Sequence, residues 1–204
     1  MKISQSGRSM VEMLGVLAII GVLSAGGLAG YSKAMKQHKL NIQREQISSL
    51  IAAEMTYQEQ IGVPEDAPIV QGAYDLVPIY KSLNAIPESM LIPNNNLYLK
   101  DKFENRVVLY TYANKDWHAI RIELNTAQNI SNCINIFETA KNYSLNLWKV
   151  AIWKNTVTTL FEAMGDKYCS SDAYCLKDIT IANYPNTCEV CKNIQSCQMY
   201  IWVE

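Results

Sequence analysis

The sequence lacks the features that several functional classes require. Its 18 lysines and arginines are balanced by 19 aspartates and glutamates, so it has no basic excess of the kind that is usual in nucleic-acid-binding proteins. Its two histidines, His38 and His118, lie far apart in the sequence, and we expect each to be a solvated polar residue rather than a catalytic base. There is no Ser-His-Asp set, Gly-rich phosphate loop or paired-carboxylate motif. The sequence therefore predicts no enzyme and no cofactor.

Proline is absent before Pro64, and cysteine is absent before Cys133. Without proline, the N-terminal segment is free to form one uninterrupted helix. The six cysteines are an even number clustered in one half of the chain, which is typical of a disulfide framework and implies an oxidising compartment.

The apolar residues are concentrated near the start, in the run Met10–Tyr31, which a single charge, Glu12, interrupts. As a helix, a run of about 20 residues spans the hydrocarbon core of a bilayer. Three interpretations compete: a secretory signal peptide cut near Ser24-Ala25-Gly26, a plain single-span anchor, and a prepilin signal.

The orientation of this helix has conflicting indications. Two basic residues precede the run, Lys2 and Arg8, and four follow it, Lys33, Lys36, Lys39 and Arg44. The positive-inside rule by itself therefore places the C-terminal side of the run in the cytoplasm. Six cysteines suited to disulfides are hard to explain in a reducing compartment. We therefore expect the N-terminus inside and the body of the protein outside.

Glu12 distinguishes among the three interpretations. A carboxylate inside an apolar segment costs about 2.5–3.5 kcal/mol at a helix centre and less near the end. A signal peptide or a simple anchor gains nothing from this cost. The natural partner for Glu12 is a positive N-terminus, created by cleavage, on a neighbouring helix.

The segment SGRSMVEMLGVLAIIGVLSAGGLAGY resembles the N-terminal signal of type IV pilins and of the pseudopilins of type II secretion. In that family a peptidase cuts after a Gly on the cytoplasmic side, the new N-terminal amine is methylated, and the fifth mature residue is Glu. The resemblance implies a leader of residues 1–7 that ends at Gly7, an N-methylated mature terminus at Arg8, and an assembly role for Glu12. Arg8 departs from the apolar first residue that is common in the family.

Beyond the apolar run, the pattern predicts that the helix continues. Apolar residues recur on one face at helical spacing: Leu40, Ile47, Leu50, Ile51, Tyr57 and Ile61. Residues 9–61 are therefore predicted to form one helix of roughly 80 Å at about 1.5 Å per residue. We expect residues 8–31 to be its transmembrane and assembly half, and residues 32–204 to form a head that includes its second half.

The rest of the chain predicts an α+β head. Residues 64–96 are rich in proline and asparagine and indicate an irregular connection with short elements. Strands are predicted over 106–113, 117–124, 145–153 and 198–203, with a hairpin turn at 114–116, and a helix over 126–142 with Ile130, Ile134 and Phe137 facing inward. Strands without βαβ alternation indicate an antiparallel sheet. This is similar to the pilin pattern of a long helix on a small sheet; the order of head elements is similar to the type IVb branch, and the short leader to the type IVa branch.

The cysteines predict three disulfides and no metal. Cys188 and Cys191 form a CxxC, but the redox alternative needs a βαβ context and the zinc alternative needs a second ligand pair. Cys133 lies on the predicted short helix and Cys197 directly precedes the last strand, so we predict that they pair and pin the C-terminal edge to the middle of the head; type IVb pilins tie their C-terminal region down in a similar way. Cys169–Cys175 with Cys188–Cys191 would complete the set, and Cys169–Cys191 with Cys175–Cys188 is the rival.

The expected function is that of a structural subunit of a type IV pilus or related filament, with roles in adhesion, motility, DNA uptake or secretion. The resemblance implies as partners the prepilin peptidase, the pilus assembly machinery and other copies of the chain. It implies an inner-membrane location with a periplasmic head before assembly, and an extracellular filament afterwards. A type II secretion pseudopilin or minor pilin is the closest alternative, and a monomeric membrane-anchored binding domain is an alternative of another class.

Overall fold

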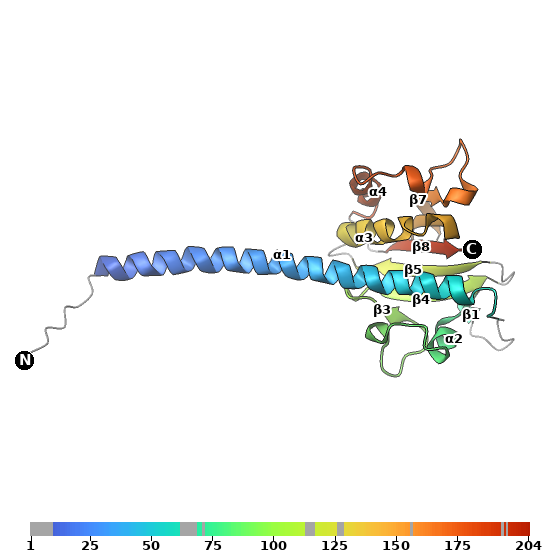
Figure 1. Cartoon of the computed structure of the whole chain (residues 1–204), viewed down its shortest axis with the longest axis horizontal. Helices are drawn as coiled ribbons and strands as arrows, with labels where there is room; N and C mark the ends of the chain where they lie inside the picture. Colours follow the sequence, from blue (N-terminus) through green and yellow to red (C-terminus); the bar gives the residue numbers. More distant parts are fainter. Residues whose placement is uncertain are drawn as a thin grey trace, which may run out of the picture. The chain divides into compact units, whose positions relative to one another are not determined.

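The computed structural model describes residues 10–61, 69–70, 72–112, 117–125, 129–155, 157–192, 194 and 196–204. The chain divides into two compact units, with the boundary between Lys39 and Leu40. The first unit holds the beginning of one long helix. The second unit holds the rest of that helix and the strands (Figure 1).

The long helix, α1, runs without interruption from Met10 to Tyr57 and contains 48 residues. Every residue from 10 to 39 is exposed, whereas Ile47, Leu50 and Ile51 are fully buried in the second unit. These three residues are three or four positions apart, so they share one face of the helix. The predicted long helix is confirmed over its described residues, except that it ends at Tyr57 and residues 58–60 form a turn.

The second unit has the predicted α+β class, with short elements between the main ones. Its strands are β1 (Ile69–Val70), β2 (Ala73–Asp75), β3 (Leu99–Lys100), β4 (Arg106–Tyr112), β5 (His118–Leu124), β6 (Leu147–Lys154), β7 (Thr158–Met164) and β8 (Cys197–Val203). Its other helices are α2 (Val77–Ser82), α3 (Asn129–Lys141) and α4 (Tyr184–Glu189). The four predicted strands correspond to β4, β5, β6 and β8, and the predicted short helix to α3. The predicted turn at 114–116 lies outside the described residues.

The strands form one antiparallel sheet in the order β1-β2-β4-β5-β8-β6-β7, with β3 also paired to β4. The last strand, β8, lies in the interior of this sheet. Its Ile201 is opposite Ile120 of β5 on one side and Val150 of β6 on the other. The prediction that the C-terminal strand is an edge held by a disulfide is therefore wrong. β8 joins the β4–β5 pair to the β6–β7 pair in the interior of the sheet.

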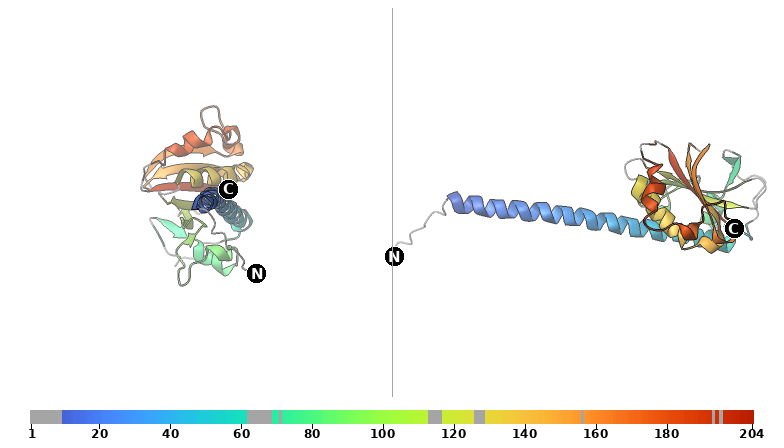
Figure 2. Two further views of the ribbon diagram at one scale, coloured as in Figure 1. Left: turned by 90° about the vertical axis from the view of Figure 1, so that its left-hand side faces the viewer. Right: turned by 90° about the horizontal axis from the view of Figure 1, so that it is seen from above.

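The two faces of the sheet have different surroundings. Figure 2 shows α3 and the second half of α1 together on one side of the curved sheet. The helices α1, α2, α3 and α4 all contribute to the main core on that side, for example through Ile47, Tyr80, Phe137 and Cys188. The opposite face carries a second apolar cluster, to which β2, β4, β5, β6 and β8 contribute, together with Tyr98 and Trp117 next to the strands.

Buried glutamines attach α1 to the rest of the second unit. Gln43 Nε2 donates to Asp101 Oδ2 at 2.6 Å, and Gln43 Oε1 accepts from Asn135 Nδ2 at 2.8 Å. Gln46 Oε1 accepts from the backbone N–H of Lys102 at 2.9 Å. Burial raises the pKa of the Asp101 carboxyl, and the hydrogen bond from Gln43 opposes that shift. Because a buried polar group without a partner costs about 1–3 kcal/mol, these bonds hold α1 at one rotation and depth against α3 and the residues that follow β3.

Three disulfides are present, as predicted, but two of the pairings differ from the prediction. Cys169 pairs with Cys175, as predicted. The predicted Cys133–Cys197 bond is wrong, because Cys133 of α3 pairs with Cys188 of α4 across a Cα–Cα distance of 5.8 Å.

The difference arises from α4, a helix that was not predicted from the sequence. Cys188 lies in α4 and Cys191 follows it, with the Cys191 N–H donating to the Cys188 carbonyl at 3.0 Å. From this turn Cys188 reaches α3, whereas Cys191 pairs with Cys197 at the start of β8, with a Cα–Cα distance of 5.5 Å. Neither the predicted Cys188–Cys191 bond nor the rival set forms. All six sulfurs are in disulfides, and the two cysteines of the CxxC, Cys188 and Cys191, each pair with a cysteine outside it.

Candidate functional site

The residues predicted for processing and assembly lie at the start of the chain. Gly7 and Arg8 are outside the described residues, so cleavage and methylation there stay predictions. Glu12 is in the first turn of α1. A carboxylate at a helix N-terminus interacts favourably with the unpaired N–H groups, so Glu12 also has a local structural explanation.

The first half of α1 exposes large apolar side chains on all sides. These side chains are Met10, Val11, Met13, Leu14, Val16, Leu17, Ile19, Ile20, Val22, Leu23 and Leu28. The helix is long and apolar enough to cross a membrane, because residues 10–31 alone extend about 33 Å against a hydrocarbon core of about 30 Å. A helix that is apolar all round is stable when lipid or other apolar surfaces cover it, and it has no polar face for water.

His118 occupies a different environment from the one predicted. It is buried, and its Nδ1 lies 2.7 Å from Oε2 of Glu54, which is also buried. The hydroxyl of Tyr80 donates to the same Glu54 oxygen at 2.5 Å, and burial together with that carboxylate raises the pKa of Tyr80. The cluster connects α1, α2 and β5 away from solvent, so we assign it to stability. His38 is exposed, as expected.

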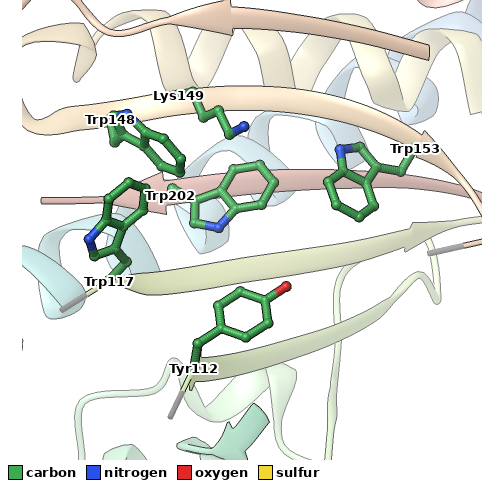
Figure 3. Close-up of a pocket in the computed structure, with 6 residues that line it drawn as sticks. All are labelled: Tyr112, Trp117, Trp148, Lys149, Trp153 and Trp202. Carbon is green, nitrogen blue, oxygen red and sulfur yellow. The ribbon is translucent and has the colours of Figure 1, made fainter. Parts of the chain in front are cut away.

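A hollow of about 300 Å³ lies over the face of the sheet opposite the helices, and we call it the tryptophan pocket. The chain contains four tryptophans, and all four line this pocket. Figure 3 shows Trp202 between the pair Trp117 and Trp148 on one side and Trp153 on the other. The full set of lining residues is Tyr112, Trp117, Trp148, Lys149, Trp153 and Trp202.

An irregularity in β6 brings two consecutive residues to the same pocket. Leu147 is opposite Val203 of β8, and Lys149 is opposite Trp202, so Trp148 is one extra residue on the β6 side. Consecutive residues of a regular strand point to opposite faces of a sheet, and a β-bulge relaxes that alternation. As a result, Trp148 and Lys149 both line the pocket.

The rings of the tryptophan pocket are held in a fixed arrangement. Trp202 is 3% exposed and forms the floor, where Tyr200 stacks on it at a centroid distance of 5.1 Å. Trp148 meets Trp202 edge-to-face at 6.1 Å, a geometry that aromatic pairs favour. Lys149 Nζ lies 4.5 Å from the ring centroid of Trp148 and 5.0 Å from that of Trp202. The pocket therefore combines an aromatic floor with one cation that is already in place.

This pocket was not predicted, although the sequence of the last strand carries a signal of it. In residues 198–203 the alternate positions Met199, Ile201 and Val203 are apolar, but Tyr200 and Trp202 between them are aromatic. When helices cover one face of a sheet, a strand that is apolar on both faces indicates that the uncovered face of the sheet also carries an apolar surface.

Comparison with known proteins adds no identification, because no family model, no curated protein and no solved structure matches the chain. The functional interpretation accordingly depends on the chemistry of α1 and of the tryptophan pocket.

Proposed function

We propose that this protein is a pilin-like filament subunit. The observation that supports the proposal most is the division of α1, which is exposed and apolar on all sides in its first half and packed on the sheet in its second half. Such a helix suits two successive environments. Lipid would cover its first half while the subunit waits in the inner membrane with a periplasmic head, and neighbouring apolar helices would cover it in an extracellular filament.

Glu12 is the second support for the proposal. A carboxylate in lipid costs about 2.5–3.5 kcal/mol at the centre of a helix, and pairing with a charge on a neighbouring subunit offsets that cost. In this proposal the prepilin peptidase cuts after Gly7, and the new amine of Arg8 pairs with Glu12 of the next copy. The pilus assembly machinery and other copies of the chain are then its partners, and the subunit itself performs no catalysis.

The cleavage step is tested by mass spectrometry of the protein purified from its native membrane. We expect a mature chain that begins at Arg8, with or without an added methyl group. A chain that begins at Met1, or one cut after Gly26, would contradict the prepilin interpretation.

The pairing step is tested with Glu12→Ala. We expect this variant to remain inserted in the membrane but to form no filaments, because the amine of the neighbouring subunit loses its partner. Glu45→Ala is the matched control, since Glu45 is an exposed carboxylate on the same helix within the second unit. Filaments are counted by electron microscopy at equal protein level. Normal filaments with Glu12→Ala would instead favour a local bond between Arg8 and Glu12, which are four residues apart.

Two alternatives to a major pilin are a subunit of a different filament assembly and a protein that forms no filament. A pseudopilin or minor pilin would share the same signal and the same mature N-terminus, and microscopy of filaments separates these from a major pilin. A monomeric membrane-anchored binding domain is favoured by the tryptophan pocket, but it gives no reason for a carboxylate in the apolar run. Sequencing of the mature N-terminus distinguishes the binding domain from a pilin and from a pseudopilin or minor pilin.

A further inference from the structure

The tryptophan pocket has the position of a binding surface. Its cluster lies on the face of the sheet opposite the main core, to which α1, α2, α3 and α4 contribute. Trp117, Trp148 and Trp153 are each partly exposed, and Tyr112 is 39% exposed. Large aromatic side chains that gather at a partly open surface hollow are typical of ligand and interaction sites. We propose that this pocket binds a neutral saccharide ring.

The position of Lys149 argues against a cationic ligand. Aromatic cages attract cations through the negative faces of their rings. Here Lys149 Nζ already lies over Trp148 and Trp202, at 4.5 and 5.0 Å from their centroids. A quaternary ammonium group would compete for the same ring faces and be repelled by the lysine.

The charge of the pocket argues against a nucleic acid strand. Proteins that bind single strands by stacking bases on aromatic rings also have a positively charged groove along the backbone. Among the described residues that line the pocket, Lys149 is the one with a charge, and Glu162 Oε2 lies 3.0 Å from its Nζ. This ion pair leaves little positive charge for phosphates.

A saccharide ring matches both the apolar and the polar parts of the site. One face of a pyranose presents C–H groups, which interact weakly but favourably with the electron-rich face of an aromatic ring. Its hydroxyl groups both donate and accept hydrogen bonds. Lys149 supplies a donor at the pocket, and Glu162 beside it balances its charge, so the site suits a neutral ligand with hydroxyl groups better than an ion of either sign.

Two further observations agree with a small neutral ligand. The volume of about 300 Å³ is at the lower end of the range for ligand pockets, which suits a ring or two rather than a folded partner. Trp153 Nε1, from a ring that lines the pocket, is buried and has no acceptor among the described residues, so one donor beside the pocket stays unpaired.

Intrinsic fluorescence tests the proposal directly, because every tryptophan of the chain lines the pocket. The full chain is placed in phospholipid nanodiscs, since glucoside and maltoside detergents would themselves present sugar rings. It is titrated with the methyl glycosides of glucose, galactose and N-acetylglucosamine, and separately with choline and with a short thymidine oligonucleotide. We expect at least one glycoside to give a saturable change in emission, half complete on the order of 1 mM. Choline and the oligonucleotide should give none.

Variants locate the binding. Trp117→Ala and Lys149→Met should each raise the half-saturation concentration about tenfold, since they remove one stacking ring and one donor. Tyr174→Ala is the matched control, because Tyr174 is 71% exposed and lies outside the tryptophan pocket. Circular dichroism establishes that each variant is folded, and a variant that unfolds is replaced by Trp117→Phe or Lys149→Gln.

The proposal is overturned by any of three results. The first is no saturable change with any of the three glycosides in the wild-type chain. The second is saturation by choline or by the oligonucleotide instead of a glycoside. The third is an affinity that stays unchanged in both folded pocket variants. None of these results bears on filament assembly, which the experiments on Glu12 and on the mature N-terminus test separately.

Discussion

Asp75 is expected to make the folded head more stable in mild acid than at neutral pH. Its side chain is 1% exposed, its Oδ1 accepts the backbone N–H of Val77 at 2.9 Å, and its Oδ2 has no hydrogen-bond donor among the described residues. Burial raises the pKa of Asp75 to about 6, although the Val77 N–H, Arg106 and Arg121 act in the opposite direction. Asp75→Asn retains the acceptor for Val77 and removes the buried charge.

The size and sign of the effect follow from proton linkage. The ordinary pKa of 3.8 and the folded value of about 6 differ by about two pH units, and each unit corresponds to about 1.36 kcal/mol. Because the folded state holds the proton more tightly, this contribution to stability is fully present below pH 3.8 and is lost as the pH rises through 6. The free energy of unfolding of Asp75→Asn minus that of the wild type should therefore increase by about 2.4 kcal/mol between pH 4 and pH 7, because a small part of the full effect of about 3 kcal/mol is already lost at pH 4.

Urea titrations of the full chain in detergent, followed by the near-ultraviolet circular dichroism of the tryptophans, measure this difference at pH 4, 5, 6 and 7. Asp172→Asn is the control, because Asp172 is exposed and its substitution should leave stability within about 0.5 kcal/mol of wild type at every pH. A wild-type protein more stable than Asp75→Asn at pH 7, or a difference that does not change with pH, would refute the reasoning.

Two other predictions concern the stability of the head. Glu54→Ala removes the partner of buried His118 and should cost about 3–5 kcal/mol of unfolding free energy in the same urea titrations, whereas exposed Glu45→Ala should cost less than about 0.5 kcal/mol; equal costs would contradict a stabilising role for the cluster. A head that starts at Gln37 and is exported to the periplasm should be soluble and unfold cooperatively, because the buried face of α1 begins beyond it. A molten or aggregated product would mean that the first half of α1 belongs to the core.

Local patterns were sufficient to predict the main elements. The α1 helix follows from the absence of proline and from apolar residues at helical spacing, such as Ile47, Leu50 and Ile51, which are properties of neighbouring residues. Strands β4, β5, β6 and β8 are rich in β-branched and aromatic residues for the same local reason. By contrast, β7 was not predicted; in its segment Thr158 and Thr159 are exposed and Ala163 is buried, so it lacks a clear alternation.

The pairing of distant segments was not predictable from such patterns. The sequence indicates that Cys133, Cys188, Cys191 and Cys197 form disulfides, but the partner of each depends on how α4 packs against α3. Similarly, the composition of β8 predicts a strand, yet its place between β5 and β6 depends on pairing with segments far away in the chain.

The sequence by itself determined the long apolar helix with its single carboxylate, Glu12, and the class of the head, because both depend on periodicity and composition along the chain. Only the tertiary structure decided that His118 is buried against Glu54, and that tryptophans from separate strands meet over one face of the sheet. An alternating pattern predicts which residues share a face of a strand. It does not predict which face of the sheet the helices will cover, because that depends on the packing of the whole domain.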